Sequence, residues 1–254
     1  MTALLAVISG SFVGFVLGLI GGGGSIVATP LLLYVVGLAP HAAIGTGALA
    51  VSANAFINFA GHARAGHVRW ASAAVFAATG VLGALAGSTI GKAVDGHKLI
   101  LLFALMMILV GILMLKPRRG GGTGHERMTP AVLAKTAGIG AAVGVMSGFF
   151  GIGGGFMIVP GLILATGMPL INAIGSSLLA VGTFGLATAL NYAASGLVDW
   201  LVAAQFIGGG IVGGYLGMRS AIHLAGHRTA LNRLFAGLVF VVAAYIIWRS
   251  IGHV

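Results

Sequence analysis

The hydrophobic pattern of the chain consists of long apolar runs separated by short polar or glycine-rich interruptions. The runs do not alternate apolar and polar residues, as barrel strands do, and a spanning helix needs about 20 apolar residues. Backbone groups in lipid must also be satisfied internally, which favours helices. We predict long helices over 3–20, 42–61, 70–91, 99–115, 133–150, 172–193, 200–222 and 229–248, and shorter apolar helices over 26–38 and 156–166.

A shift of about 130 residues aligns the two halves of the sequence without a gap. The stretch "AIGTGALAV" (43–51) falls on "AIGSSLLAV" (173–181), and "GHVRW" (66–70) falls on "GLVDW" (196–200). Chance similarity between apolar segments does not readily give an ungapped register of Gly, Pro and Trp, so we infer an internal repeat. In the same register Gly14, Gly18, Gly21, Gly23, Gly24 and Pro30 fall on Gly144, Gly148, Gly151, Gly153, Gly154 and Pro160.

The repeat predicts an all-α polytopic membrane protein with four to five helical segments in each half and eight to ten membrane segments in total. A basic, glycine-rich stretch, "KPRRGGGTGHERMTP", separates the halves and has the composition of an exposed linker. We therefore expect an N-terminal transmembrane repeat over 1–116, a linker over 117–130 and a C-terminal transmembrane repeat over 131–254.

The distribution of basic residues distinguishes inverted from parallel halves. If the short segments 26–38 and 156–166 count as crossings, each half has an odd number of crossings and the halves are inverted. Ten of the thirteen basic residues then share one side, whereas parallel halves give eight against five. The positive-inside rule favours the first arrangement. We predict inverted repeats in the bacterial inner membrane, with a cytoplasmic linker and both termini outside.

The composition supports a membrane protein and excludes several classes of function. Hydrophobic residues make up 59% of the chain and charged residues 6%, with a mean hydropathy of +1.11, whereas soluble domains are about 25% charged. Cysteine is absent, which excludes disulfides and thiolate metal sites. The net charge of +10 is explained by basic loops and not by nucleic-acid binding. No nucleophile–base set or metal-ligand cluster is visible, so we expect neither an enzyme nor a cofactor.

Two glycine-rich runs, "GLIGGGGSIVATP" (18–30) and "GFFGIGGGFMIVP" (148–160), interrupt the helical pattern at matching places. In lipid such breaks would leave backbone groups unsatisfied, so they are expected in a protein-lined or watery site. Paired breaks of this kind mark the central site of a transporter, and the helix that follows each break presents free N–H groups to an anion. The alternative is a hinge without a ligand. The candidate binding residues at the breaks are Gly23, Gly24, Ser25, Gly153, Gly154 and Gly155.

Hydroxyl and amide side chains on the following long helices are further candidates, because they can donate hydrogen bonds to an oxyanion. Thr46, Asn54 and Asn58 share one helical stripe. Helix–helix hydrogen bonding is the alternative for these groups, with equal weight for the asparagines. The second half contributes Ser176, Ser177 and Asn191.

The ionisable residues are expected near the membrane surfaces. The only acids, Asp95, Glu126 and Asp199, fall in predicted loops or at helix ends. His41, His62 and His67 flank the predicted helix 42–61, and interfacial positions are expected for them, with a proton relay as the alternative.

The doubled pattern G-x-x-G-x-G-G-x(5)-P, followed by A-I-G-[TS] and G-x-V-[DR]-W, resembles the TauE/SafE-like sulfite exporter family of membrane permeases. The halves differ slightly, with Arg69 where the second half has Asp199, and "GGGGS" where it has "GIGGG". The resemblance implies transport of sulfite, thiosulfate or organosulfonates, with export as the family-weighted direction.

We therefore expect a secondary transporter that binds a small sulfur-containing anion near the bilayer midplane, between the two broken helices. Rocking of the inverted halves would alternate access to the site. The expected partners are this anion, membrane lipid and a coupling ion, either a proton or sodium; a homodimer is left open. The alternative functions are a passive anion channel of the same architecture and a non-transporting membrane accessory protein.

Overall fold

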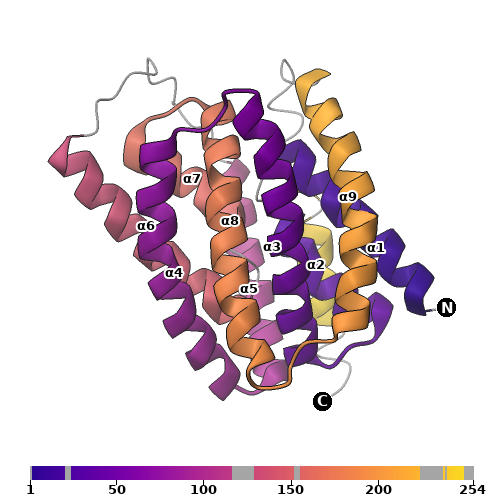
Figure 1. The fold of residues 1–254 in the computed structure, drawn as a ribbon. Coiled ribbons are helices and arrows are strands. Elements are labelled where there is room, and N and C mark those ends of the chain that lie inside the picture. The colour runs from indigo at the N-terminus through magenta and orange to yellow at the C-terminus, as the bar shows by residue number, and fades with distance from the viewer. Residues whose placement is uncertain are drawn as a thin grey trace.

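The computed structural model describes residues 2–20, 24–115, 129–151, 155–223, 237 and 239–248, and every regular element in this part of the chain is a helix (Figure 1). In chain order the elements are α1 (Thr2–Ile20), α2 (Ser25–Leu31), η2 (Leu32–Val36), α3 (Pro40–Arg64), α4 (Trp70–Ala93), α5 (Gly96–Leu115), α6 (Pro130–Phe150), α7 (Gly155–Thr166), α8 (Leu170–Ala193) and α9 (Trp200–His223). Residues 239–248 are also helical.

Six helices of the described chain are long and apolar enough to cross a membrane. Shorter apolar helices cover Ser25–Val36, Gly96–Leu109, Met157–Thr166 and Val239–Trp248. The prediction of an all-α polytopic membrane protein is therefore confirmed, and the protein is integral to a membrane. Pro40 and Pro130 begin α3 and α6 slightly before the predicted starts, because proline has no N–H to leave unsatisfied in a first helical turn. The division into repeats and a linker stays a prediction, since residues 116–128 lie outside the described ranges.

The chain follows the same path in both halves. Gly37 and Gly167 end their short helical segments with φ angles of 88° and 68°, and Gly66 and Gly196 follow α3 and α8 with φ angles of 72° and 70°. Glycine adopts this left-handed conformation without the steric strain that other residues incur. Both pairs are separated by the spacing of the sequence repeat, so the backbone geometry repeats together with the sequence.

The long helices α3 and α8 lie side by side and run in opposite directions (Figure 1). Gly45, near the start of α3, packs against Leu197 beyond the end of α8, and Gly175, near the start of α8, packs against His67 beyond the end of α3. Midway along the pair, the Ser52 hydroxyl donates a 2.6 Å hydrogen bond to the carbonyl of residue 182, its own repeat mate. When two halves are related by a two-fold axis, equivalent residues of the two halves contact each other at that axis. The predicted inversion stays a prediction, and this geometry supports it.

Close glycine contacts join the halves on both sides of this central pair. α1 packs on α9, and α4 packs on α6. A methyl group on Gly14 would meet the backbone of Gly210, and one on Gly144 would meet the backbone of Gly80. Small residues at helix interfaces let the backbones approach closely in a membrane protein. Each half therefore supplies one helix to each outer pair, and the halves interlock.

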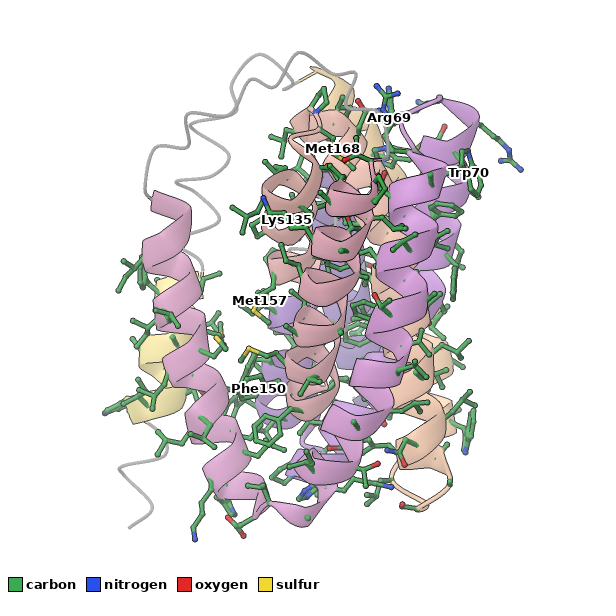
Figure 2. All side chains as sticks on the ribbon, turned by 90° about the vertical axis from the view of Figure 1, so that its left-hand side faces the viewer. Arg69, Trp70, Lys135, Phe150, Met157 and Met168 are labelled. Atoms are coloured by element: carbon green, nitrogen blue, oxygen red, sulfur yellow. The ribbon has the colours of Figure 1, made fainter. Side chains whose placement is uncertain are left out.

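α6 and α7 form a hairpin around the second glycine break. Figure 2 shows Phe150 low in the bundle, Met157 near mid-height, and Met168 at the same end as Arg69. Gly161 of α7 packs against Ile139 of α6, so the chain returns towards the end where α6 begins. The twelve residues of α7 rise about 18 Å, less than the hydrocarbon thickness. We call the end of the bundle that carries Arg69 the Arg69 end, and the opposite end, where α8 meets Asp199, the Asp199 end.

Candidate functional site

The predicted hydroxyl ligands Thr46 and Ser176 join the two halves at opposite ends of the bundle. The Thr46 hydroxyl accepts a 2.9 Å hydrogen bond from the backbone N–H of Asp199, and the Ser176 hydroxyl accepts a 2.9 Å bond from the backbone N–H of Arg69. Both side chains are fully buried. The helical rise from Thr46 to Arg64 is about 27 Å. One small anion therefore cannot contact both hydroxyls at once.

Asn191 belongs to a polar cluster at the Asp199 end. The Lys92 ammonium donates to the Asn191 carbonyl at 3.0 Å, to its side-chain oxygen at 2.8 Å and to the Ser195 hydroxyl at 2.9 Å. The Asn191 amide donates in turn to the Ser88 hydroxyl at 2.7 Å. The cluster ties the end of α4 to the end of α8. Ser177 makes a local bond, with its hydroxyl 2.7 Å from a carbonyl one turn earlier in α8.

The asparagines predicted on α3 form a buried polar stripe that faces α9. Asn54 is fully buried, and neither its amide nitrogen nor its amide oxygen has a hydrogen-bond partner. The side-chain amide of Asn58 donates a 2.9 Å bond to the backbone carbonyl of Asn54. Gly210 and Gly214 of α9 leave the room for these two side chains. Gly214 also contacts Gly18 near the end of α1, so Asn58 lies level with the start of the first glycine break.

The flanks of the first break are tightly packed. A methyl group on Gly24 would meet the backbone of Leu17, so the chain turns back directly onto α1. Ser25, the first residue of α2, is fully buried. The candidates Gly23, Gly153 and Gly154 lie outside the described residues.

The second break lies nearer the Asp199 end. Gly151 ends α6 in a left-handed conformation, and a side chain there would meet Ile44, which is close to Thr46 at the start of α3. Gly155, the next described residue, is buried at the start of α7. The described flanks of the two breaks thus lie towards opposite ends of the bundle. The first break follows α1 at the level of Asn58, and the second break lies beside Ile44 near the start of α3.

The second half fills the position of the asparagine stripe with an aromatic ring. Phe184, the repeat mate of Asn54, packs over Gly80, the repeat mate of Gly210. Its ring stacks on Phe76 with the ring centroids 6.1 Å apart. Thr188, the mate of Asn58, is buried and its hydroxyl has no partner. The same groove is therefore polar in the first half and largely apolar in the second.

His62 extends the polar stripe by one further helical turn. Its side chain is only 4% exposed, and neither ring nitrogen has a hydrogen-bond partner. The His67 ring lies 5.6 Å away between centroids. His62 lies in the last turn of α3, so its predicted interfacial position stays a prediction, but its side chain is buried in protein and not exposed to water. The regular spacing of Asn54, Asn58 and His62 was the available signal.

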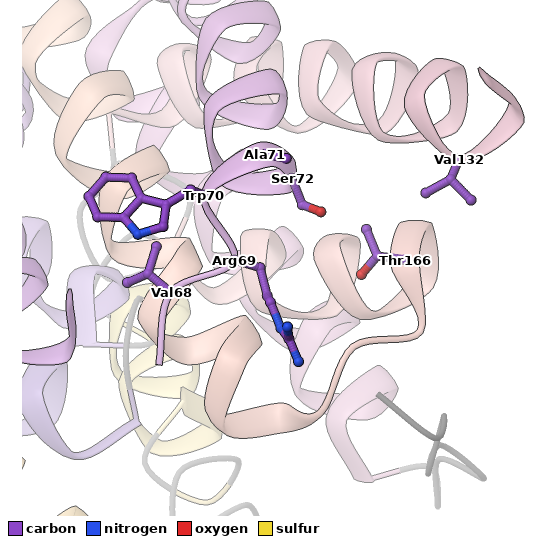
Figure 3. Close-up of a pocket in the computed structure, with 7 residues that line it drawn as sticks. All are labelled: Val68, Arg69, Trp70, Ala71, Ser72, Val132 and Thr166. Carbon is purple, nitrogen blue, oxygen red and sulfur yellow. The ribbon is translucent and has the colours of Figure 1, made fainter. Parts of the chain in front are cut away.

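A cavity of about 290 Å³ opens at the Arg69 end (Figure 3). Its lining residues are Val68, Arg69, Trp70, Ala71, Ser72, Val132 and Thr166. Figure 3 shows the Arg69 side chain among these residues, with its guanidinium pointing away from Ser72. The Thr166 hydroxyl donates its hydrogen to the Leu162 carbonyl at 2.8 Å, so the groups of this lining that suit a small anion are the guanidinium of Arg69 and the hydroxyl of Ser72.

The acids of the described chain lie at the Asp199 end and cap helices, as predicted. The Asp95 carboxylate accepts bonds of 3.1 Å from the N–H groups of His97 and Lys98 at the start of α5, and the Lys98 N–H lowers the pKa of Asp95 below its usual 3.8. The Asp199 carboxylate accepts a 3.0 Å bond from the N–H of Val202 in α9. In the described ranges no group of three or more His, Cys, Asp or Glu residues is arranged to hold a metal ion.

The chain matches the family model described as "Sulfite exporter TauE/SafE" over residues 6–246. It is 58% identical over 244 residues to a probable membrane transporter protein of Xylella fastidiosa, which covers 95% of this chain and 94% of that protein. It is 26% identical over 273 residues to the probable membrane transporter protein YunE of Bacillus subtilis, covering 99% of each chain. A probable membrane transporter protein of Methanocaldococcus jannaschii is 28% identical over 207 residues, covering 78% of this chain and 72% of that protein. No solved structure matches the chain.

Proposed function

Because the chain belongs to the TauE/SafE sulfite exporter family and is thus a membrane transporter, we propose that it is a secondary transporter that exports a small sulfur-containing anion. Sulfite, thiosulfate and organosulfonates are the candidate substrates. The residues of the candidate site bear most directly on one part of this proposal, which is that the substrate is an anion and not a cation.

The observation that carries the choice of an anion is the unpartnered amide of Asn54. Its nitrogen is buried in an apolar bundle and has two hydrogens to donate, which an oxyanion can accept. A divalent cation is usually held by carboxylate oxygens together with neutral ones, and the described acids Asp95 and Asp199 cap helices at one end of the bundle. The polar stripe itself carries no carboxylate.

The proposed binding site lies where the first glycine break meets the asparagine stripe. Asn54 and Asn58 would donate amide hydrogens, and the backbone N–H groups around Gly23, Gly24 and Ser25 would hold the anion oxygens. In this proposal Gly153, Gly154 and Gly155 line the matching position in the second half. Thr46, Ser176 and Asn191 then hold the helices together at the two ends, where the path must open and close, and Ser177 bonds within α8.

The proposed orientation places the Arg69 end in the cytoplasm. Of the described basic residues, Arg64, Arg69 and Arg219 lie towards this end and Lys92 and Lys98 towards the other. The cavity beside Arg69 would collect anions from the cytoplasm. The Asp199 end, with Asp95 and Asp199, would face outwards. Inverted halves then alternate access by rocking about the central α3–α8 pair.

The first experiment measures anion binding and transport directly. The purified protein is tested by thermal shift with sulfite, thiosulfate, sulfate, sulfoacetate and taurine, and the anions that bind are loaded into proteoliposomes for efflux measurements. We expect a stabilising shift with at least one sulfur anion, because a ligand that binds only the folded protein stabilises it. We also expect efflux against an anion gradient when an ion gradient drives it.

The controls separate this proposal from the alternatives. Flux that always runs downhill, whatever ion gradient is applied, would indicate a passive channel. A protein that binds and moves none of these anions, but responds to a cation or a neutral solute, would contradict the proposal. Asn54→Asp is the matched variant, since a carboxylate of nearly the same size should repel the anion and abolish the thermal shift.

A further inference from the structure

The histidine pair at the end of the asparagine stripe, His62 and His67, has a chemistry that anion binding alone does not use. His62 lies one helical turn beyond Asn58 on the face of α3 that meets α9. Both of its ring nitrogens lack partners, and so does Nδ1 of His67. A buried imidazole without an acceptor for its N–H loses the hydrogen bonds that water would supply. Such a group persists where it exchanges a proton or a ligand.

The surroundings of the pair supply no described negative charge. The described charged and titratable side chains of the surrounding elements at this end are Arg64, His67, Arg69 and Arg219. The neighbouring start of α8 presents Asn172, whose amide donates a 3.3 Å bond to the His67 carbonyl. Asp95 and Asp199 lie at the opposite end, and Glu126 is outside the described residues.

An imidazolium at His62 would therefore need its counter-charge from a bound ligand. The proposed anion site lies one to two helical turns away along the same stripe, at Asn58 and Asn54. A positive charge on the histidine pair strengthens anion binding there, and by linkage the bound anion strengthens protonation of the pair by the same factor. Binding of the anion and binding of the proton therefore strengthen each other.

We propose that His62 and His67 form the proton-carrying site of this transporter, so that a proton travels together with the anion. His67 is partly exposed and His62 is buried behind it, which gives the proton a route from water to the stripe. A hydronium ion at the Arg69 end transfers its proton to the lone pair of an imidazole nitrogen and leaves as water. After the halves rearrange, the imidazolium returns this proton to water on the other side, and no other bond changes. The inference rests on the proposed function and specifies its coupling ion.

The test records anion and proton movement in the same proteoliposomes. Thiosulfate and sulfoacetate are the probes because, unlike sulfite, neither takes up a proton near neutral pH. Anion efflux is measured by ion chromatography, and internal pH is reported by trapped pyranine. In the wild-type protein, efflux of the anion should make the vesicle interior more alkaline, since the proton leaves with it.

The variants His62→Gln and His67→Gln keep a polar side chain but cannot carry a proton. We expect each to reduce the proton movement per anion to near background, because glutamine has no group that titrates, while downhill anion efflux persists. The matched control is His97→Gln, at the exposed start of α5 at the other end, which should behave like the wild type. Because His67 lies in a partly exposed loop, its variant provides a test even if His62→Gln fails to fold.

The two proposals fail in different ways. Efflux of either anion without any change of internal pH in the wild-type protein would overturn the histidine proposal and leave anion transport standing. Proton movement that is unchanged in both variants would also overturn it. If neither anion moves and none of the wider panel binds, the proposed function fails, and the histidine proposal falls with it.

Discussion

Two grooves related by the internal repeat share a backbone and differ in chemistry. In the first half, Asn54 lies over Gly210 of α9, and in the second half Phe184 lies over Gly80 of α4. The amide of Asn54 has no partner, whereas the Phe184 ring stacks on Phe76. The glycines are needed in both grooves because the backbones approach closely, so the scaffold is conserved between the halves while the side chain in the groove is not.

The difference continues along both helices. Asn58 and His62 in the first half correspond to Thr188 and Tyr192 in the second. At the adjoining loops, Arg69 corresponds to Asp199. The first half therefore has a polar stripe that leads to a basic end, and the second half has a more apolar stripe that leads to an acidic residue. We infer that the halves contribute unequally to binding, although they form one interlocked bundle.

The largest effect is expected from closing the glycine breaks. Gly24→Leu places a side chain against the α1 backbone at Leu17, and its repeat mate Gly154→Leu is the matching change. Both should reduce transport to background, since both halves must move, but only Gly24→Leu should also abolish anion binding. The measurements are efflux and thermal shift, with Gly138→Leu as a control because its site is open. Normal flux in both variants would show that the breaks are not part of the transport path.

Exchanging the side chains in the two grooves tests whether the halves contribute unequally to anion binding. Asn54→Phe copies the second half into the first and removes a hydrogen bond to a charged ligand, which corresponds to a loss of affinity of about tenfold or more. The reverse change, Phe184→Asn, should leave affinity nearly unchanged. Affinity is measured by titration of the anion that gives the strongest thermal shift. Equal losses in the two variants would indicate that the halves share the site symmetrically.

The smallest effect is expected at the matched hydrogen bonds between the halves. Thr46→Val and Ser176→Ala each remove one buried acceptor of a backbone N–H, and each should lower the free energy of unfolding by about 1 kcal/mol. Because the sites lie at opposite ends, the double variant should show the sum. Unfolding in detergent measures this. A loss of anion binding greater than the loss of stability would show that these hydroxyls contact the substrate after all.

Periodicity and composition were sufficient for the helices, since lipid forces the backbone to satisfy its own hydrogen bonds. Two helices begin earlier than the hydrophobic pattern predicted, at Pro40 and Pro130. Hydrophobicity alone does not show that proline is well suited to the first turn of a helix. It was harder to predict which polar residues bind a ligand and which join helices. Thr46 and Ser176 appeared beside the breaks in the sequence, yet their bonds to Asp199 and Arg69 come from the other half, which a linear pattern does not reveal.

The sequence by itself determined that the protein is helical, lies in the membrane and repeats its plan, because hydrophobic length, glycine spacing and charge are local properties of the chain. Only the tertiary structure decided which polar groups meet. The antiparallel contact of α3 with α8 and the close packing of α9 on α3 bury Asn54 and His62 without partners, and send Thr46 and Ser176 to opposite ends. Burial and pairing depend on contacts between distant segments, and these contacts turn one repeated pattern into two unlike grooves.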